Sequence, residues 1–397
     1  MLCNFDELVN RKQTCSIKYD FAPERGKPES AIPLWIADMD FYTLPAVIDA
    51  LVERSKHGIF GYTDSKADYT EAVINWFSSR FNWQPEAEWL VKSPGVVHAV
   101  ATAIRAFTLP GEAVLVQRPV YAPLFTLVEQ NKRKAVNNPL IYRDGRYEMD
   151  FADFEAKIKA NNVRLFMLCS PHNPVGRVWT QTELARIVEI CRRYKVIVVS
   201  DEIHADFVYS GRRHIMSACV NKDCLDNIVT CTAPSKTFNL AGLQISNIFI
   251  ANPELRSAFV NEMHYGGVNG VNTMGLVACQ TAYEQGAEWL DELLLYLEGN
   301  LAFVRGFIQQ KLPQVRLVEP EGTYLLWLDF GDLFPNAAER EKFLLHKAGL
   351  WLSSGIGFGQ EGSSFERLNI ACPRELLVQA LTRLQAAFEG RALNSQS

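Results

Sequence analysis

The sequence predicts an α/β fold: a large domain with a mainly parallel sheet sandwiched by helices, plus a smaller α+β domain. The chain has 397 residues, more than one hydrophobic core usually organises, so two domains are expected. Between about residues 90 and 280, short apolar runs alternate with helical stretches, as in a parallel sheet covered on both faces. From about residue 286 this alternation stops. We therefore expect a large domain at 46–285 and a small domain that combines 1–45 with 286–397.

The elements of the large domain follow from the periodicity of its apolar residues. Residues 1–45 are irregular and rich in proline, and helical periodicity appears at 46–56 and 66–82. Continuous apolar runs, typical of strands buried on both faces, occur at 113–116, 163–169, 196–200, 227–231 and 247–251. The helix before the third run begins with a capping box formed by Thr180 and Glu183.

The small domain has a different character. A long amphipathic helix is predicted from about residue 286 to the residue before Pro313. Shorter elements follow it: strands at 324–328 and 367–371, helices at 336–348 and 374–388, and a loop at 353–364. This order indicates an α+β arrangement.

Composition excludes several classes of function. The net charge is −5, so there is no excess of basic residues to attract nucleic acid or anionic lipid. No basic and apolar leader and no run of membrane-spanning length occurs, so we expect a cytoplasmic protein without membrane contact. The cysteines number nine, and none forms a Cys-x-x-Cys pair, which indicates neither a disulfide framework nor a metal site. Four in apolar segments are expected to be buried: Cys169, Cys191, Cys231 and Cys279.

One lysine stands out. Lys236 lies in a run of small and apolar residues, 232–243, directly after a predicted strand. Burial would lower the pKa of its amine, and a neutral amine is a nucleophile that forms Schiff bases with aldehydes. The common alternative is a lysine that extends its ammonium to water from a loop.

Polar residues follow other predicted strands. Asp201 and His204 follow the strand at 196–200, and Asn173 follows the strand at 163–169. Ligands gather at the carboxyl ends of strands in open α/β sheets, so these side chains are expected to meet Lys236 there. Taken alone, each residue could instead have a purely structural role: Asp201 as a helix cap, His204 as a structural histidine and Asn173 as part of a turn.

Two further features complete a binding site for pyridoxal 5′-phosphate. The turn Gly95-Val96-Val97 opens an apolar helix, whose N-terminal amides can bind a phosphate. Tyr121 offers an aromatic ring to stack on the pyridine, although singly it would be a core residue. An aspartate that keeps the pyridine nitrogen protonated and a lysine that forms the Schiff base are the groups that this cofactor requires.

The motifs also resemble a known family. The segments 170–177, 200–206 and 233–244 are similar to those of the aspartate-aminotransferase superfamily, the pyridoxal-phosphate transferases of fold type I. The resemblance is greatest to its cystathionine β-lyase or C–S lyase branch, the MalY/PatB type. It covers nearly the whole chain and includes 35–41 near the start and 367–374 near the end.

The resemblance implies a role for each candidate residue. Lys236 corresponds to the Schiff-base lysine and proton carrier, and Asp201 to the partner of the pyridine nitrogen. Asn173, assisted by His204, would bond the ring hydroxyl. The remaining roles are ring stacking and catalysis by Tyr121, phosphate binding by Gly95, Val96 and Val97, a contact of Tyr62 with the partner subunit's phosphate, and substrate binding by Arg367 and Ala37.

Two positions depart from the aminotransferase pattern. Gln244 stands where aminotransferases usually carry a phosphate-binding arginine, as expected in the lyase branch. Ala233 stands where they often carry a serine, so a phosphate hydroxyl would come from Thr232 or Ser235.

The expected activity is α,β-elimination of cystathionine or another S-substituted L-cysteine to pyruvate, ammonia and a thiol. The alternative on the same scaffold is a class I/II aminotransferase, and His204 with Gln244 favours the lyase. A regulatory binder that retains the fold is a further alternative, against which the intact Lys236, Asp201 and Arg367 argue. The resemblance also implies a homodimer with active sites at the interface.

Overall fold

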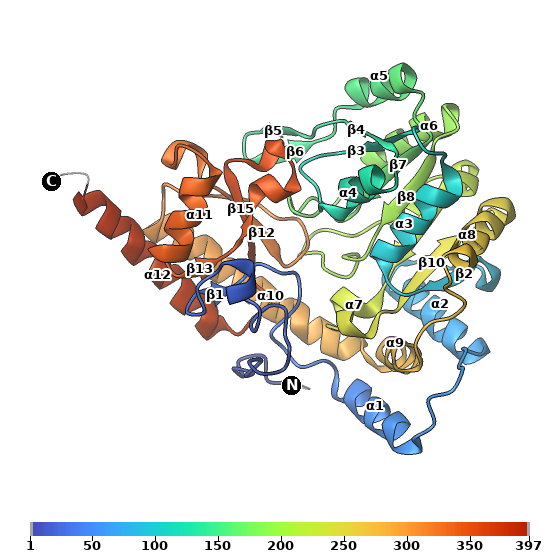
Figure 1. Cartoon of the computed structure of the whole chain (residues 1–397), viewed down its shortest axis with the longest axis horizontal. Helices are drawn as coiled ribbons and strands as arrows, with labels where there is room; N and C mark the ends of the chain where they lie inside the picture. The colour runs from blue at the N-terminus through green and yellow to red at the C-terminus, as the bar shows by residue number, and fades with distance from the viewer. Residues whose placement is uncertain (1–2, 395–397) are drawn as a thin grey trace.

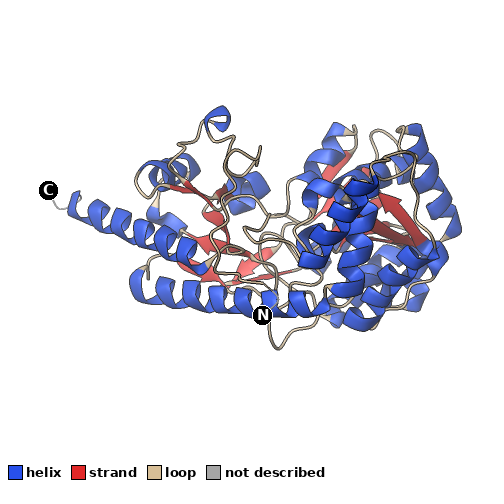
Figure 2. Cartoon of the chain, turned by 90° about the horizontal axis from the view of Figure 1, so that it is seen from below, coloured by secondary structure: helices blue, strands red, loops and turns tan. Residues whose placement is uncertain are grey.

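The computed structural model describes residues 3–394 and contains two lobes (Figure 1). The larger lobe is built on a seven-stranded sheet, and the smaller lobe on a four-stranded antiparallel sheet. The expected α/β fold with a second α+β part is therefore confirmed. Figure 2 shows the strands of the larger lobe enclosed by helices on both sides.

The large sheet has the order β2-β10-β9-β8-β7-β3-β4. Its strands are β2 (Leu90–Ser93), β10 (Ser246–Ile250), β9 (Ile228–Thr232), β8 (Ile197–Asp201), β7 (Leu165–Cys169), β3 (Ala113–Val116) and β4 (Lys134–Asn137). Neighbours from β9 to β4 are parallel, whereas β10 is antiparallel to both β9 and β2. The parallel strands therefore direct their carboxyl ends to one edge.

The predicted strands lie within two residues of the observed ones, and every residue of β3, β7, β9 and β10 is buried. Because successive side chains of a strand point to opposite faces of the sheet, each strand contributes to two hydrophobic cores. One core lies under α3 (Val96–Phe107), α4 (Pro123–Gln130) and α8 (Pro253–Tyr265). The other includes α5 (Phe151–Asn161) and α6 (Gln181–Arg193), and the predicted capping box of Thr180 and Glu183 is confirmed at the start of α6.

The other helices of the larger lobe are α1 (Pro45–His57), α2 (Ala67–Phe81), α7 (Pro234–Thr237) and α9 (Thr273–Gln285). A hairpin of β5 (Ile141–Arg143) and β6 (Arg146–Glu148) also occurs there. The four cysteines expected in the core are buried.

The smaller sheet has the order β11-β12-β15-β14. Its strands are β11 (Arg316–Val318), β12 (Leu325–Asp329), β15 (Phe365–Asn369) and β14 (Ser353–Ser354). Its helices are α11 (Ala337–His346), α12 (Arg374–Asn394) and the long α10 (Ala287–Lys311), which runs from the larger lobe behind the smaller one in the view of Figure 1. The loop expected at 353–364 contains the short strand β14 and two 3-10 turns.

Part of the N-terminal segment packs against the smaller lobe. Its short strand β1 (Ile32–Pro33) pairs in parallel with β13 (Leu350–Trp351). Further along, Asn369 Nδ2 donates to the carbonyl oxygens of Ile36 and Asp38 at 2.8 and 2.7 Å. These bonds hold residues 32–38 against a part of the chain more than 300 positions away. Among residues 3–394, no helix is both long and apolar enough to cross a membrane.

Candidate active site

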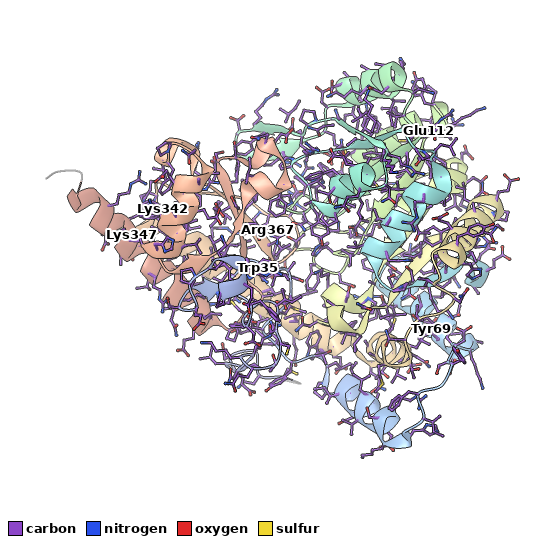
Figure 3. All side chains as sticks on the ribbon, in the orientation of Figure 1. Trp35, Tyr69, Glu112, Lys342, Lys347 and Arg367 are labelled. Carbon is purple, nitrogen blue, oxygen red and sulfur yellow. The ribbon has the colours of Figure 1, made fainter. Side chains whose placement is uncertain are left out.

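A cavity of about 820 Å³ lies between the lobes. The predicted site residues that line it are Ala37, Gly95, Val96, Val97, Tyr121, Asn173, Asp201, His204, Ser235, Lys236 and Arg367. They come from the segments at and after the carboxyl ends of β3, β7, β8 and β9, from the start of α3, from the N-terminal segment and from β15 of the smaller lobe. Figure 3 shows the labelled Arg367 and Trp35 close together at the junction of the lobes.

Lys236 lies on α7, which begins two residues after β9 ends. Its Nζ donates to the carbonyl oxygen of Ala37 at 2.5 Å. Burial, and secondly the positive charge of Arg367, lower the lysine pKa to about 8, while Asp38 and Asp201 oppose this shift. More of this amine is therefore neutral near physiological pH than in an exposed lysine, as a nucleophile or base requires.

Asp201 is the last residue of β8, and its side chain is buried at the cavity wall. Burial raises its pKa to about 6, with Lys236 acting in the opposite direction. Its Oδ1 accepts one hydrogen bond, from the backbone N–H of Ile203 at 3.2 Å. A buried carboxylate with so few donors is stabilised by a cation placed beside it, such as a protonated ring nitrogen.

His204 is kept neutral by its surroundings. Burial, and then the charges of Lys236 and Arg367, lower its pKa well below the ordinary value. Its Nδ1 is buried and has no hydrogen-bond partner among residues 3–394. The ring lies edge-on to Tyr324 at 5.8 Å between centroids. A neutral imidazole with a free nitrogen can accept or donate one hydrogen bond to a ligand group.

Arg367 and Asn173 form a pair that spans the cavity wall. Arg367 Nη1 donates to Asn173 Oδ1 at 2.9 Å, and Nη2 donates to the carbonyl oxygen of Trp35 at 2.8 Å and to Ser353 Oγ at 3.2 Å. The Nε atom is buried without a partner in the described chain. With its oxygen held by Arg367, Asn173 has its amide N–H groups left to donate to a ligand.

The start of α3 offers backbone donors. Gly95 precedes it with φ 127°, a conformation that a side chain would strain, and helix N-termini carry unpaired N–H groups. Of the two candidate hydroxyls, Ser235 lines the cavity. Thr232 is buried elsewhere, where its hydroxyl donates to the carbonyl oxygen of Asn247 at 2.7 Å. Gln244 also lines this wall.

The two candidate tyrosines occupy different places. Tyr121 lines the cavity, its backbone N–H donates to the Asn173 carbonyl oxygen at 3.0 Å, and burial raises its pKa. Tyr62 does not line the cavity of its own chain. It lies fully exposed on the segment between α1 and α2, beside the exposed Phe60.

The smaller lobe contributes residues that the sequence reasoning missed. Tyr324 donates its hydroxyl to the Ala37 carbonyl oxygen at 3.2 Å, so that this oxygen accepts from both Tyr324 and Lys236. Ser353 Oγ donates to the Trp35 carbonyl oxygen at 2.6 Å while it accepts from Arg367. Trp35 lay within a recognised motif, but no local pattern marked Ser353 or Tyr324 as site residues.

The family model for aminotransferases of class I and II matches residues 30–384. The chain belongs to this family. It is 42% identical to the protein named cystathionine beta-lyase PatB of Bacillus subtilis strain 168, over 97% of this chain and all of the relative.

Solved structures superpose on nearly the whole chain. One is a PLP-bound putative aminotransferase of Clostridium difficile 630, with a TM-score of 0.95 and 39% identity over 97% of this chain and 99% of that one. Another is the PLP-bound C–S lyase of Staphylococcus hominis, with a TM-score of 0.90 and 34% identity over 97% of each chain. Among residues 3–394, no group of His, Cys, Asp and Glu side chains is arranged to hold a metal ion.

Proposed function

We propose that the protein is a pyridoxal-phosphate-dependent C–S β-lyase that cleaves cystathionine or other S-substituted L-cysteines to pyruvate, ammonia and a thiol. The observation that carries this proposal is one cavity containing Lys236, Asp201 and Arg367 in a chain 42% identical to cystathionine beta-lyase PatB. The relatives with solved structures include a PLP-bound C–S lyase.

The donor set of the cavity fits this cofactor. The α3 N-terminus and Ser235 would bind its phosphate, and Asp201 its pyridine nitrogen. The free amide of Asn173 and the unpaired Nδ1 of His204 suit the ring hydroxyl. Tyr121 would stack on the ring. When bound, pyridoxal 5′-phosphate supplies an aldehyde for the substrate amine and a ring that holds the electron pair released at Cα.

The side chains of this protein bind the substrate and move its protons. A guanidinium has five N–H donors, and Arg367 uses three of them within the protein. The Nε–H, which has no partner in the described chain, can donate to the substrate α-carboxylate and so help to orient the Cα–H bond. Lys236 accepts the Cα proton because its pKa of about 8 leaves neutral amine available. The Cβ–S bond then breaks with its electron pair on sulfur, and water converts the remaining fragment to pyruvate and ammonia.

The deciding experiment counts pyruvate without any added keto acid. A lyase expels the thiolate and regains its starting cofactor unaided, so cystathionine or S-methyl-L-cysteine should give many equivalents of pyruvate per active site. The same-scaffold alternative is an aminotransferase, the activity named for the C. difficile structure. An aminotransferase would stop after one equivalent of amino transfer until a keto acid is added, and that result would overturn the proposal.

We also propose a homodimer whose partner completes the phosphate site through Tyr62. Tyr62, Phe60 and Ile59 are exposed on one loop, where three large apolar side chains favour burial against a second subunit. A monomer that is fully active in sedimentation at assay concentration would contradict this.

We propose in addition a cytoplasmic location, which cell fractionation tests. The division into a large domain at 46–285 and a small domain of 1–45 with 286–397 is also a proposal, which limited proteolysis tests.

A further inference from the structure

The same cavity has an outer wall that the proposed chemistry does not use. Arg25, Lys27 and Glu341 line it together with the aromatic residues Trp35 and Trp351. This wall comes from the N-terminal segment and the smaller lobe. The inner groups, Lys236 and Arg367, take the α-amine side and the α-carboxylate of an L-cysteine thioether. The sulfur substituent is then the part of the substrate left to meet the outer wall.

Arg25 is held in place by aromatic packing. Its guanidinium carbon lies 5.2 Å from the centroid of the Trp35 ring. Trp35 in turn stacks on Trp351, with centroids 4.5 Å apart and ring planes 12° from parallel. Cation–π contact at this distance restricts the side chain while its N–H groups stay free to bind an anion.

The backbone that carries Arg25 is also fixed. Arg25 ends a 3-10 turn, Pro23–Arg25, that Gly26 closes with φ 65°. The N–H groups of Arg25 and Lys27 both donate to the Ala22 carbonyl oxygen, at 3.1 and 2.8 Å. Ala22 itself is buried in a small cluster with Trp351. The backbone of Arg25, an exposed residue, therefore has a defined position beside the cavity.

Arg25 differs from its neighbour in having no acidic partner. Lys27 forms an ion pair with Glu341. Among residues 3–394, Arg25 forms no ion pair and no side-chain hydrogen bond, although it lines the cavity. An arginine that faces a binding cavity without a carboxylate partner has its full donor set available for a carboxylate on a ligand.

We propose that Arg25 binds a carboxylate carried by the leaving thiol, so that it selects L-cysteine thioethers with a distal carboxylate over neutral S-alkyl cysteines. This inference rests on the proposed lyase function and adds a specificity-determining residue to it. Cystathionine belongs to the selected class because its leaving thiol carries an amino-acid group.

The test compares two substrates of similar size with the holoenzyme. S-(2-carboxyethyl)-L-cysteine carries the distal carboxylate, and S-propyl-L-cysteine does not. Arg25→Gln should lower kcat/KM for the carboxyethyl substrate about 5- to 30-fold, mainly through KM, because one charge-assisted contact at a partly solvated site is lost. The propyl substrate should change less than about twofold. Arg143→Ala removes an exposed arginine on β5 that does not line the cavity, and should change neither substrate.

Charge reversal provides a second comparison. Arg25→Glu should lower kcat/KM for the carboxyethyl substrate further and should raise it for S-(2-aminoethyl)-L-cysteine. The wild-type preference for the carboxyethyl substrate should also shrink as salt is raised, because solvated charges are screened. Equal losses for the carboxyethyl and propyl substrates, or an unchanged ratio between them, would overturn the inference.

A binding measurement separates this inference from the proposed reaction. Calorimetry with cofactor-loaded Lys236→Ala protein gives dissociation constants for both thioethers without turnover. Tighter binding of the carboxyethyl compound that disappears when Arg25→Gln is added supports the role of Arg25, even if the wild-type protein released no pyruvate and the lyase proposal failed. Equal affinities for the two compounds would refute the role of Arg25 while leaving the lyase proposal intact.

Discussion

Replacing Arg367 by lysine keeps the positive charge but removes the planar guanidinium whose Nε–H is free to donate to the substrate carboxylate. Arg367 already donates to Asn173, Trp35 and Ser353 through Nη1 and Nη2, and its Nε–H is left for the substrate. A lysine ammonium has three donors in all, and the neighbouring acceptors compete for them. We expect the loss of about one charge-assisted hydrogen bond, roughly 1.5–3 kcal/mol. At 1.4 kcal/mol per tenfold change, kcat/KM should fall about 10- to 150-fold.

The assay is steady-state pyruvate release, followed with lactate dehydrogenase and NADH. KM should rise and kcat should fall together, because the same contact binds the substrate and orients its Cα–H bond. The matched control is Arg340→Lys, which changes a buried arginine that pairs with Glu366 and does not line the cavity. It should lower the melting temperature with little effect on kcat/KM. A folded Arg367→Lys protein with kcat/KM within about twofold of wild type would refute the assigned role.

Three further substitutions test the active-site lysine, the proposed subunit interface and the dependence of stability on pH. Lys236→Ala should abolish turnover and remove both the visible absorbance of the bound cofactor and its borohydride-reducible link; wild-type turnover would disprove the assignment. Tyr62→Phe should weaken cofactor binding by roughly 1.5–3 kcal/mol in equilibrium dialysis, one hydrogen bond to a charged group, and an unchanged affinity would contradict the shared site. Burial lowers the pKa of His172 to about 4, so only the unfolded chain takes up this proton between about pH 6.5 and 4. The contribution of His172 to the free energy of unfolding should therefore decrease as the pH is lowered through this range, by up to about 1.4 kcal/mol per unit, and His172→Gln should change the difference between urea titrations at pH 5 and 7 by that contribution; an identical difference would exclude the effect.

The buried strands were predictable because each forms a continuous apolar run. The edge strands β2 and β4 were missed because their residues are mostly half-exposed and show no such run. The β5–β6 hairpin did carry a signal, since its turn is Asp144-Gly145 with both φ angles positive, a common two-residue hairpin turn. The antiparallel direction of β10 depends on the path of the chain across the sheet edge, which local periodicity does not encode.

The site residues also divide into those that the sequence predicted and those that required the structure. Asp201, Asn173 and Lys236 could be placed together from sequence because each lies at, or shortly after, the carboxyl end of a parallel strand of one sheet. Ser353 and Arg25 reach the cavity only through the packing of the smaller lobe on the larger one. No spacing in the sequence indicates that packing, so their places required the structure.

The hydrogen bonds that hold residues 32–38 can form only late in the synthesis of the chain. These residues leave the ribosome early, but their partners, β13 and Asn369, emerge only after more than 300 further residues have been added. At the usual rate of about 5–20 residues per second, the nascent chain waits about 15–60 seconds for them. In the last part of that time, after β10 has been made, the larger lobe with Lys236 has all of its sheet strands available, while the Ala37 carbonyl that accepts from Lys236 still lacks its partners in the smaller lobe. If translation stalls between α10 and β15, the nascent chain would therefore contain Lys236 but would lack the residues of the smaller lobe that form the opposite wall of its cavity.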